Sequence, residues 1–171
     1  MEFFDLFNDD RIPLGKTIER GTPLSKGENR QVIHVIIFNS KNEMLIQKRT
    51  PNKKHWPSLW DTSCGGCCQA GETSRESAAR ELYEELGIVY DFSNERPFFT
   101  INFENGFDDV YILQLDFPTE NVKLQPEEVS EAKWASRSEI AELISNDMFV
   151  PYVAGYVDLL FELRKQRGVI L

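Results

Sequence analysis

Three glutamates in one short stretch, Glu81, Glu84 and Glu85, could bind a divalent metal ion. On a helix, at about 100° per residue, these side chains fall within a sector of roughly 100°. No lysine stands in register with them, so their repulsion costs about 0.2–0.5 kcal/mol per pair on an isolated helix. Mg²⁺ prefers oxygen ligands and commonly bridges one or two carboxylates to phosphate groups. The spacing therefore predicts a metal-binding patch that acts on a phosphorylated compound.

The residues around these glutamates predict the helix that must carry them, over residues 73–86. Thr73 or Ser74 can cap its start, Glu76 lies in its first turn, and Gly87 follows its last turn, where glycine is favoured. The opposite side of this helix is expected to pack against the rest of the fold through Ala79, Leu82, Tyr83 and Leu86.

A longer motif surrounds this helix. From Gly66 to Ile88 the chain fits the pattern glycine, five residues, glutamate, seven residues, then Arg-Glu-aliphatic-any-Glu-Glu-any-Gly-aliphatic. All nine specified positions match. The stretch resembles the Nudix box, and the chain is therefore similar to the Nudix hydrolases.

This resemblance implies an α/β/α sandwich with a mixed central sheet and a catalytic loop-helix-loop. It also implies Mg²⁺- or Mn²⁺-dependent cleavage of the diphosphate bond of a nucleoside diphosphate derivative or a related organic diphosphate. By position, Glu81, Glu84 and Glu85 resemble the metal-binding carboxylates, helped by the backbone carbonyl near Gly66. Arg80 resembles the residue that orients Glu81 and forms a structural salt bridge with Glu72.

Basic residues before the box are candidates for substrate contacts. Lys48, Arg49, Lys53 and Lys54 form the densest basic cluster of the chain, and from it we expect Arg49 and Lys54 to contact the substrate. The general base stays open at this point. It is one of the glutamates of the box or a later residue, for which the candidates are Glu127, Glu128 and Glu131.

Two other functions compete with hydrolysis. Residues 47–49 and 53–61 are similar to the Nudix branch that includes isopentenyl diphosphate isomerase. That isomerase needs a catalytic cysteine two residues before a histidine, and the aligned positions here hold Gly65 and Cys67, which disfavours isomerisation. A catalytically silent binding module of the same fold is the second alternative. Its expected signature is a damaged Arg-Glu-Glu-Glu set, whereas the set is complete here.

Composition limits the partners. The 171 residues include 19 Lys and Arg against 28 Asp and Glu, a formal charge of -9, which disfavours a nucleic acid polymer as partner. No apolar run reaches the 18 or so residues of a membrane span, and the acidic N-terminus is unlike a signal peptide, so we expect a cytoplasmic protein without membrane contact. Cys64, Cys67 and Cys68 are too close in sequence to join distant segments and are expected to be thiols. A homodimer is possible.

The remaining elements are expected to form one domain over residues 1–171, with residues 1–30 packed on it as an N-terminal extension. Strands are predicted at 2–7, 16–20, 32–38, 44–48, 96–103, 109–117 and 132–135. The strands at 32–38 and 44–48 form a predicted hairpin, and a long loop follows at 49–63. Ser136 caps a predicted helix that runs to about 144, and a C-terminal helix is predicted over 150–166, opened by Pro151.

Overall fold

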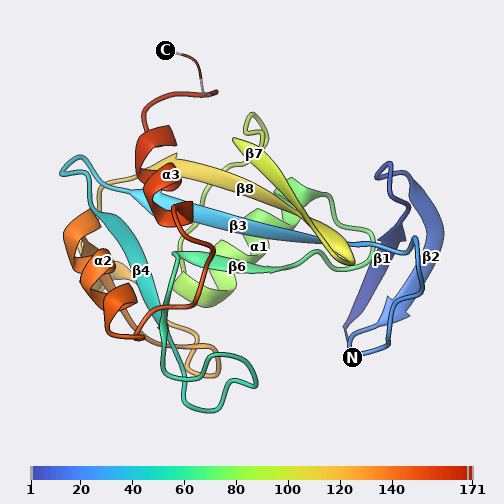
Figure 1. Cartoon of the computed structure of the whole chain (residues 1–171), viewed down its shortest axis with the longest axis horizontal. Coiled ribbons are helices and arrows are strands. Elements are labelled where there is room, and N and C mark those ends of the chain that lie inside the picture. The colour runs from blue at the N-terminus through green and yellow to red at the C-terminus, as the bar shows by residue number, and fades with distance from the viewer. Residues whose placement is uncertain (1, 169, 171) are drawn as a thin grey trace.

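A mixed β-sheet forms the centre of the computed structural model, which describes residues 2–168 and 170 (Figure 1). Hydrogen-bonded neighbours run in the order β5-β4-β3-β8-β7, while β6 pairs with β3 and β9 pairs with β4. The central strands β3 and β8 are parallel along their whole length. The strands are β3 (Arg30–Phe38), β4 (Met44–Arg49), β5 (Trp60–Asp61), β6 (Cys64–Cys67), β7 (Phe99–Phe103), β8 (Gly106–Gln114) and β9 (Val129–Ala135).

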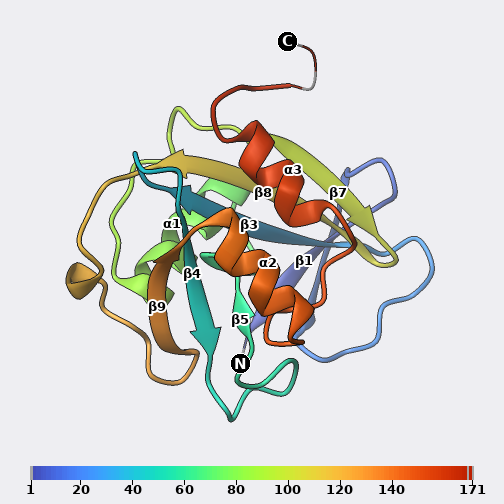
Figure 2. The same cartoon turned by 60° about the vertical axis from the view of Figure 1, so that its left-hand side comes forward.

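Helices cover both faces of this sheet (Figure 2). Helix α1 (Ser74–Leu86) lies on one face, and α2 (Arg137–Ser145) and α3 (Tyr156–Leu163) lie on the other, while a 3-10 turn, η1, spans Thr119–Asn121. Side chains of β3 alternate between the two layers: Val35 joins the core under α1, and Ile36 joins the core under α2 and α3. The predicted α/β/α sandwich is therefore confirmed. Within the described part of the chain, no helix is long and apolar enough to cross a membrane.

The N-terminal segment forms a separate two-stranded sheet, β1 (Phe3–Phe7) and β2 (Pro13–Glu19), drawn in blue beside the central sheet in Figure 1. It is attached to the loop before α1 by two hydrogen bonds. The Ala70 amide donates to the Phe3 carbonyl at 2.8 Å, and the Gly71 amide donates to Asp5 Oδ2 at 2.7 Å. This hairpin therefore fixes the loop that leads into the acidic helix. Residue 1 of the predicted extension lies outside the described residues, as do 169 and 171.

The predicted hairpin of residues 32–38 and 44–48 is only partly present. Strands β3 and β4 are antiparallel, but their only register pair is Phe38 with Met44 in the described residues. Beyond it, β6 pairs with β3 and β9 pairs with β4, so the two strands diverge. The hairpin of β7 and β8 forms at its Asn-Gly signal as predicted, with β8 starting at 106 instead of 109.

The C-terminal helix is shorter than predicted: it covers Tyr156–Leu163, not 150–166. Pro151 does not open the helix, because the residues on either side of Pro151 bond to strand β5. The Val150 amide donates to the Trp60 carbonyl at 2.8 Å, and the Tyr152 hydroxyl donates to Asp61 Oδ1 at 2.6 Å. Gly155, in the left-handed region at φ 83°, then provides the turn into the helix. Tertiary contacts outweigh the local proline signal here.

Candidate active site

Helix α1 begins and ends at the predicted signals. The Thr73 hydroxyl accepts a hydrogen bond from the Glu76 amide, and the Glu76 carboxylate accepts one from the Thr73 amide, which together make a capping box. Gly87 adopts the left-handed conformation, φ 67°, directly after the last turn. One expectation is wrong: Tyr83 is 61% exposed and does not pack, because the core of this layer is filled by Leu82 and Leu86.

The acidic side of α1 borders a cleft of about 190 Å³. Four segments far apart in sequence supply its other walls: the N-terminal hairpin, strand β6, the loop after β4, and the loop before β9. Charged groups of both signs meet in it. The lining residues are Glu2, Arg20, Arg49, Lys53, Gly65, Gly66, Cys67, Gln69, Arg80, Glu81, Glu84, Glu85, Gln125 and Glu128.

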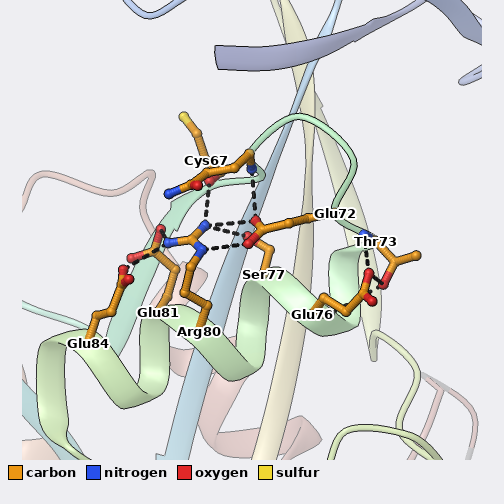
Figure 3. A network of polar contacts seen from close by, with 9 residues as sticks. Cys67, Glu72, Thr73, Glu76, Ser77, Arg80, Glu81 and Glu84 are labelled. Carbon is orange, nitrogen blue, oxygen red and sulfur yellow. Dashed lines mark hydrogen bonds and ion pairs between the residues drawn. The ribbon is translucent and has the colours of Figure 1, made fainter. Parts of the chain in front are cut away.

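Arg80 is the centre of a polar network on this helix (Figure 3). Its Nε and Nη2 donate to the two carboxylate oxygens of Glu72 at 2.7 and 2.9 Å, a bidentate pair. Its Nη1 donates to Glu81 at 2.9 Å and to Glu84 at 3.0 Å, and its Nη2 also reaches the Cys67 carbonyl at 3.2 Å. Burial opposes charge on Glu72, but the bonds from Arg80 outweigh it and lower the pKa of that carboxyl. Arg80 therefore ties the loop and β6 to the acidic helix.

Glu85 is the least exposed of the three glutamates, at 6%. Burial, followed by the negative charges of Glu81 and Asp61, raises its pKa to about 8. Its Oε2 is buried and has no hydrogen-bond partner within residues 2–168 and 170. A buried carboxylate oxygen without a partner is costly unless a cation or a proton compensates it. This oxygen is therefore a fitting ligand for a divalent ion.

Gly66 gives Glu81 the space that it occupies. A Cβ added at Gly66 would overlap the carboxylate of Glu81. Burial raises the pKa of Glu81, although Arg80 opposes that shift. The three carboxylates do not converge on one point, and the described residues contain no ready cluster of three acidic, histidine or cysteine groups. The reason is visible in Figure 3, where Glu81 and Glu84 both point toward Arg80. Glu84 has a side chain that is 44% exposed, and its contact with Arg80 holds it on this side of the helix.

Gly66→Ala is expected to reduce metal affinity and activity at least about tenfold while leaving the fold intact, because the new methyl group displaces the Glu81 carboxylate. The strand itself tolerates alanine, since Gly66 pairs regularly with Ile33. Titration with Mn²⁺ followed by electron paramagnetic resonance measures the affinity, and circular dichroism checks the fold. Unchanged Mn²⁺ affinity in the folded variant would remove Glu81 from the metal site.

Besides Arg80, three cations lie in the cleft with the acidic residues: Arg20, Arg49 and Lys53. Arg49 was expected there from the sequence. Lys54, the other expected contact, is exposed and does not line the cleft, whereas its neighbour Lys53 does and pairs with Glu128. Sequence reasoning missed Arg20, which the N-terminal hairpin brings to the cleft together with Glu2, its ion-pair partner at 2.6 Å.

The three later candidates for the general base, Glu127, Glu128 and Glu131, differ in whether they line the cleft. Glu128 lines the cleft, but Glu127 and Glu131 do not. Glu131 instead pairs with Lys48 at 2.8 Å on the exposed face of β9. Glu128 is thus the candidate from this region that lies in the cleft with Glu81 and Glu85.

The cysteines and Gly65 bear on the alternative of isomerisation. All three cysteines are free thiols, and burial raises the pKa of each, to about 12 for Cys68. A Cβ at position 65 would lie 2.6 Å from His34 Cδ2, so the protein has no room there for a cysteine side chain unless His34 moves. Cys64 is buried in the core under α1. The structure therefore supplies no thiol at the isomerase position.

Comparisons with known proteins identify the family to which the chain belongs. A family model described as NUDIX domain matches residues 28–152. An uncharacterized Nudix hydrolase of Listeria monocytogenes is 44% identical over 164 residues, 96% of each chain. An isopentenyl-diphosphate Delta-isomerase of Pectobacterium atrosepticum is 32% identical over 143 residues, 80% of this chain and 78% of that one. The crystal structure of a Deinococcus radiodurans protein has a TM-score of 0.74 at 26% identity and covers 94% of this chain and 98% of its own.

The sandwich, the acidic helix and these matches together define a hydrolase that acts on pyrophosphate bonds. The chain belongs to the Nudix family.

Proposed function

We propose that this chain hydrolyses the diphosphate bond of a nucleoside diphosphate derivative or a related organic diphosphate, with Mg²⁺ or Mn²⁺ held by Glu81, Glu84 and Glu85. The observation that carries the proposal is the buried oxygen of Glu85, which has no partner among the described residues and lies in a cleft that also holds Arg49 and Lys53. Acidic and basic groups in one cleft suit a cation and a polyanion bound together.

In this proposal each part of the cleft has one task. A bound divalent ion supplies neutralisation of phosphate charge and activation of water. Arg49, Lys53 and Arg20 contact the phosphate oxygens, and Arg80 holds Glu81 in position. Glu128 accepts the proton from the attacking water as a new P–O bond forms and the phosphoanhydride bond breaks.

The test is turnover of a diphosphate panel by the purified chain in ¹⁸O-labelled water with Mg²⁺ or Mn²⁺. The panel contains nucleotide sugars, dinucleotides, nucleoside diphosphates and triphosphates, and prenyl diphosphates. We expect metal-dependent cleavage with one ¹⁸O atom in one phosphate product. Conversion of isopentenyl to dimethylallyl diphosphate without phosphate release would establish the isomerase instead, and binding without turnover would establish a binding module.

A matched pair of variants tests the basic wall of the cleft. Lys53→Met is expected to raise KM about tenfold, because Lys53 lines the cleft, whereas Lys54→Met, one residue further along, should leave KM near the wild-type value. Steady-state kinetics with the best substrate of the panel measures both. Equal effects of the two substitutions would mean that the charge of the loop matters and not the position of Lys53.

A further inference from the structure

A second cavity, of about 240 Å³, adjoins the cleft and has no role in the scheme above. The two share Arg49 and Gly65 as wall residues, so a ligand whose phosphates lie in the cleft can extend into the side cavity. The side cavity lies between strands β3, β4 and β5 and the segment before α3. Its polar wall residues are His34, Gln47, Asp61, Thr62 and Tyr152.

Gln47 is the unusual residue of this wall. It is only 4% exposed, and it follows Ile46 in a strand whose other residues are mostly buried and apolar. Its carbonyl oxygen, Oε1, is buried and has no hydrogen-bond partner in the described part of the chain. A buried acceptor without a donor costs free energy, and a donor from a ligand in the adjoining cavity would offset that cost.

No neighbouring polar group donates to this oxygen among the described residues, and several of them bond to one another instead. Asp61 accepts hydrogen bonds from the Tyr152 hydroxyl at 2.6 Å and from Arg49 Nη1 at 3.2 Å. His34 Nδ1 is bonded to Asp108 at 2.7 Å. These contacts hold the wall residues in place. The amide of Gln47 is then the group of the wall that can form a hydrogen bond with the ligand.

Trp56 supplies an apolar face at the same cavity. Trp56 lines the cavity although it is 49% exposed, and its backbone adopts φ 48°, a conformation that is rare for a bulky residue. Backbone strain of this kind is often kept where it positions a side chain for binding. An organic group in the cavity would thus meet the aromatic residues Trp56 and Tyr152 beside the unpaired acceptor of Gln47.

We propose that Gln47 determines substrate specificity by accepting a hydrogen bond from an N–H or O–H group on the organic part of the diphosphate substrate. The inference rests on the proposed function and names the chemistry that the side cavity selects. A nucleobase or a sugar carries such a donor. A prenyl chain carries none and would bury the carbonyl of Gln47 unpaired, so prenyl diphosphates are expected to be poor substrates.

The experiment compares wild type with Gln47→Met, which keeps the length of the side chain and removes the amide. Values of kcat/KM are measured for nucleoside diphosphates, for 5-phosphoribosyl 1-diphosphate and for geranyl diphosphate. We expect Gln47→Met to lower kcat/KM at least about tenfold for the donor-bearing substrate that wild type prefers, with no loss for geranyl diphosphate. Preference for the phosphoribosyl compound places the donor on a sugar, and a loss of turnover by nucleoside diphosphates with methylated base N–H groups places it on a base.

Gln114→Met is the matched control, because Gln114 is exposed at the end of β8 and lines neither the cleft nor the side cavity. It should leave the substrate ratio unchanged. If Gln47→Met does not fold, the test uses the wild-type enzyme instead. Its turnover is measured with nucleoside diphosphates whose base N–H groups are methylated and whose sugar hydroxyls are intact. Loss of turnover on methylation, or a preference for the phosphoribosyl compound, supports the proposal. An unchanged substrate ratio in Gln47→Met, or a wild-type preference for geranyl diphosphate, overturns it. Absence of any hydrolysis would instead contradict the proposed function.

Discussion

Glu85→Gln is expected to lower diphosphate hydrolysis at least about a hundredfold and, without metal, to raise the melting temperature above that of wild type at pH 8. Glutamine keeps the size of the side chain and one carbonyl oxygen, but it has no charge to bind a divalent ion. The same loss of charge removes a repulsion from the folded protein, because Glu85 is buried beside Glu81 and Asp61. Activity and metal-free stability should therefore change in opposite directions.

The pH dependence of this stability follows from the pKa of Glu85, which rises from 4.5 to about 8 on folding. Between these pH values the folded chain holds a proton that the unfolded chain releases, so stability falls as pH rises toward 8. In a chelator, the melting temperature of wild type should fall across this range more steeply than that of Glu85→Gln. Each kcal/mol corresponds to about 2–4 °C for a chain of this size.

Glu84→Gln is the control for this stability measurement, because the Glu84 side chain is far more exposed than that of Glu85. Its melting temperature should follow the pH slope of wild type. Addition of Mg²⁺ at pH 7 should release a proton from wild type, measured in buffers of different ionisation enthalpy, and a smaller amount from Glu85→Gln. Identical pH slopes in all three proteins would show that Glu85 is ionised without cost and is not positioned as a metal ligand.

The sequence predicted those parts of the site that depend on local signals. The capping box of Thr73 and Glu76 and the terminal glycine set the limits of α1, and these signals act within a few residues. A helical period then places Glu81, Glu84 and Glu85 on one side. The alternation of β3 between two cores is likewise readable from its apolar run, interrupted only by His34, which is typical of a strand buried on both faces.

Other parts of the site could not be predicted because they depend on contacts between distant segments. Arg20 reaches the cleft through the packing of the N-terminal hairpin on the loop before α1. The choice of Lys53 over Lys54 depends on the path of a long loop, in which one residue changes the direction of a side chain. Pro151 fails as a helix start because Val150 and Tyr152 bond to β5. Gln47 did leave a signal, as a polar residue after Met44-Leu45-Ile46, but its unpaired carbonyl is visible only in three dimensions.

Arg80→Lys is expected to reduce both stability and activity, although it keeps the positive charge. Lysine lacks the planar fork that lets Arg80 bind both oxygens of Glu72 while it also contacts Glu81 and Glu84. The Arg80 and Glu72 side chains are each about four-fifths buried. Loss of one partner from a buried pair costs up to about 3–5 kcal/mol, and retention of the charge should keep the loss at or below about 3 kcal/mol.

The measurements that separate a structural from a catalytic effect of Arg80→Lys are thermal unfolding and the pH profile of kcat. The positive charge of Arg80 lowers the pKa of Glu81 against the effect of burial, so a weaker contact should raise that pKa. The acidic limb of the pH profile is then expected to move to higher pH. Arg75→Lys on the same helix is the control, because Arg75 bonds only to the Ser93 carbonyl among the described residues, and the pH profile should not move.

A double-mutant cycle of Arg80→Lys with Glu72→Gln then measures the coupling that the bidentate geometry implies. Because the two side chains share two hydrogen bonds, the combined loss of stability should be smaller than the sum of the single losses by about 1 kcal/mol or more. Strict additivity would mean that the loop of Glu72 docks through its other contacts. The separate bond from Arg80 Nη1 to Glu81 is tested by the acidic limb of the pH profile, which would stay where it is in wild type if Arg80 did not position Glu81.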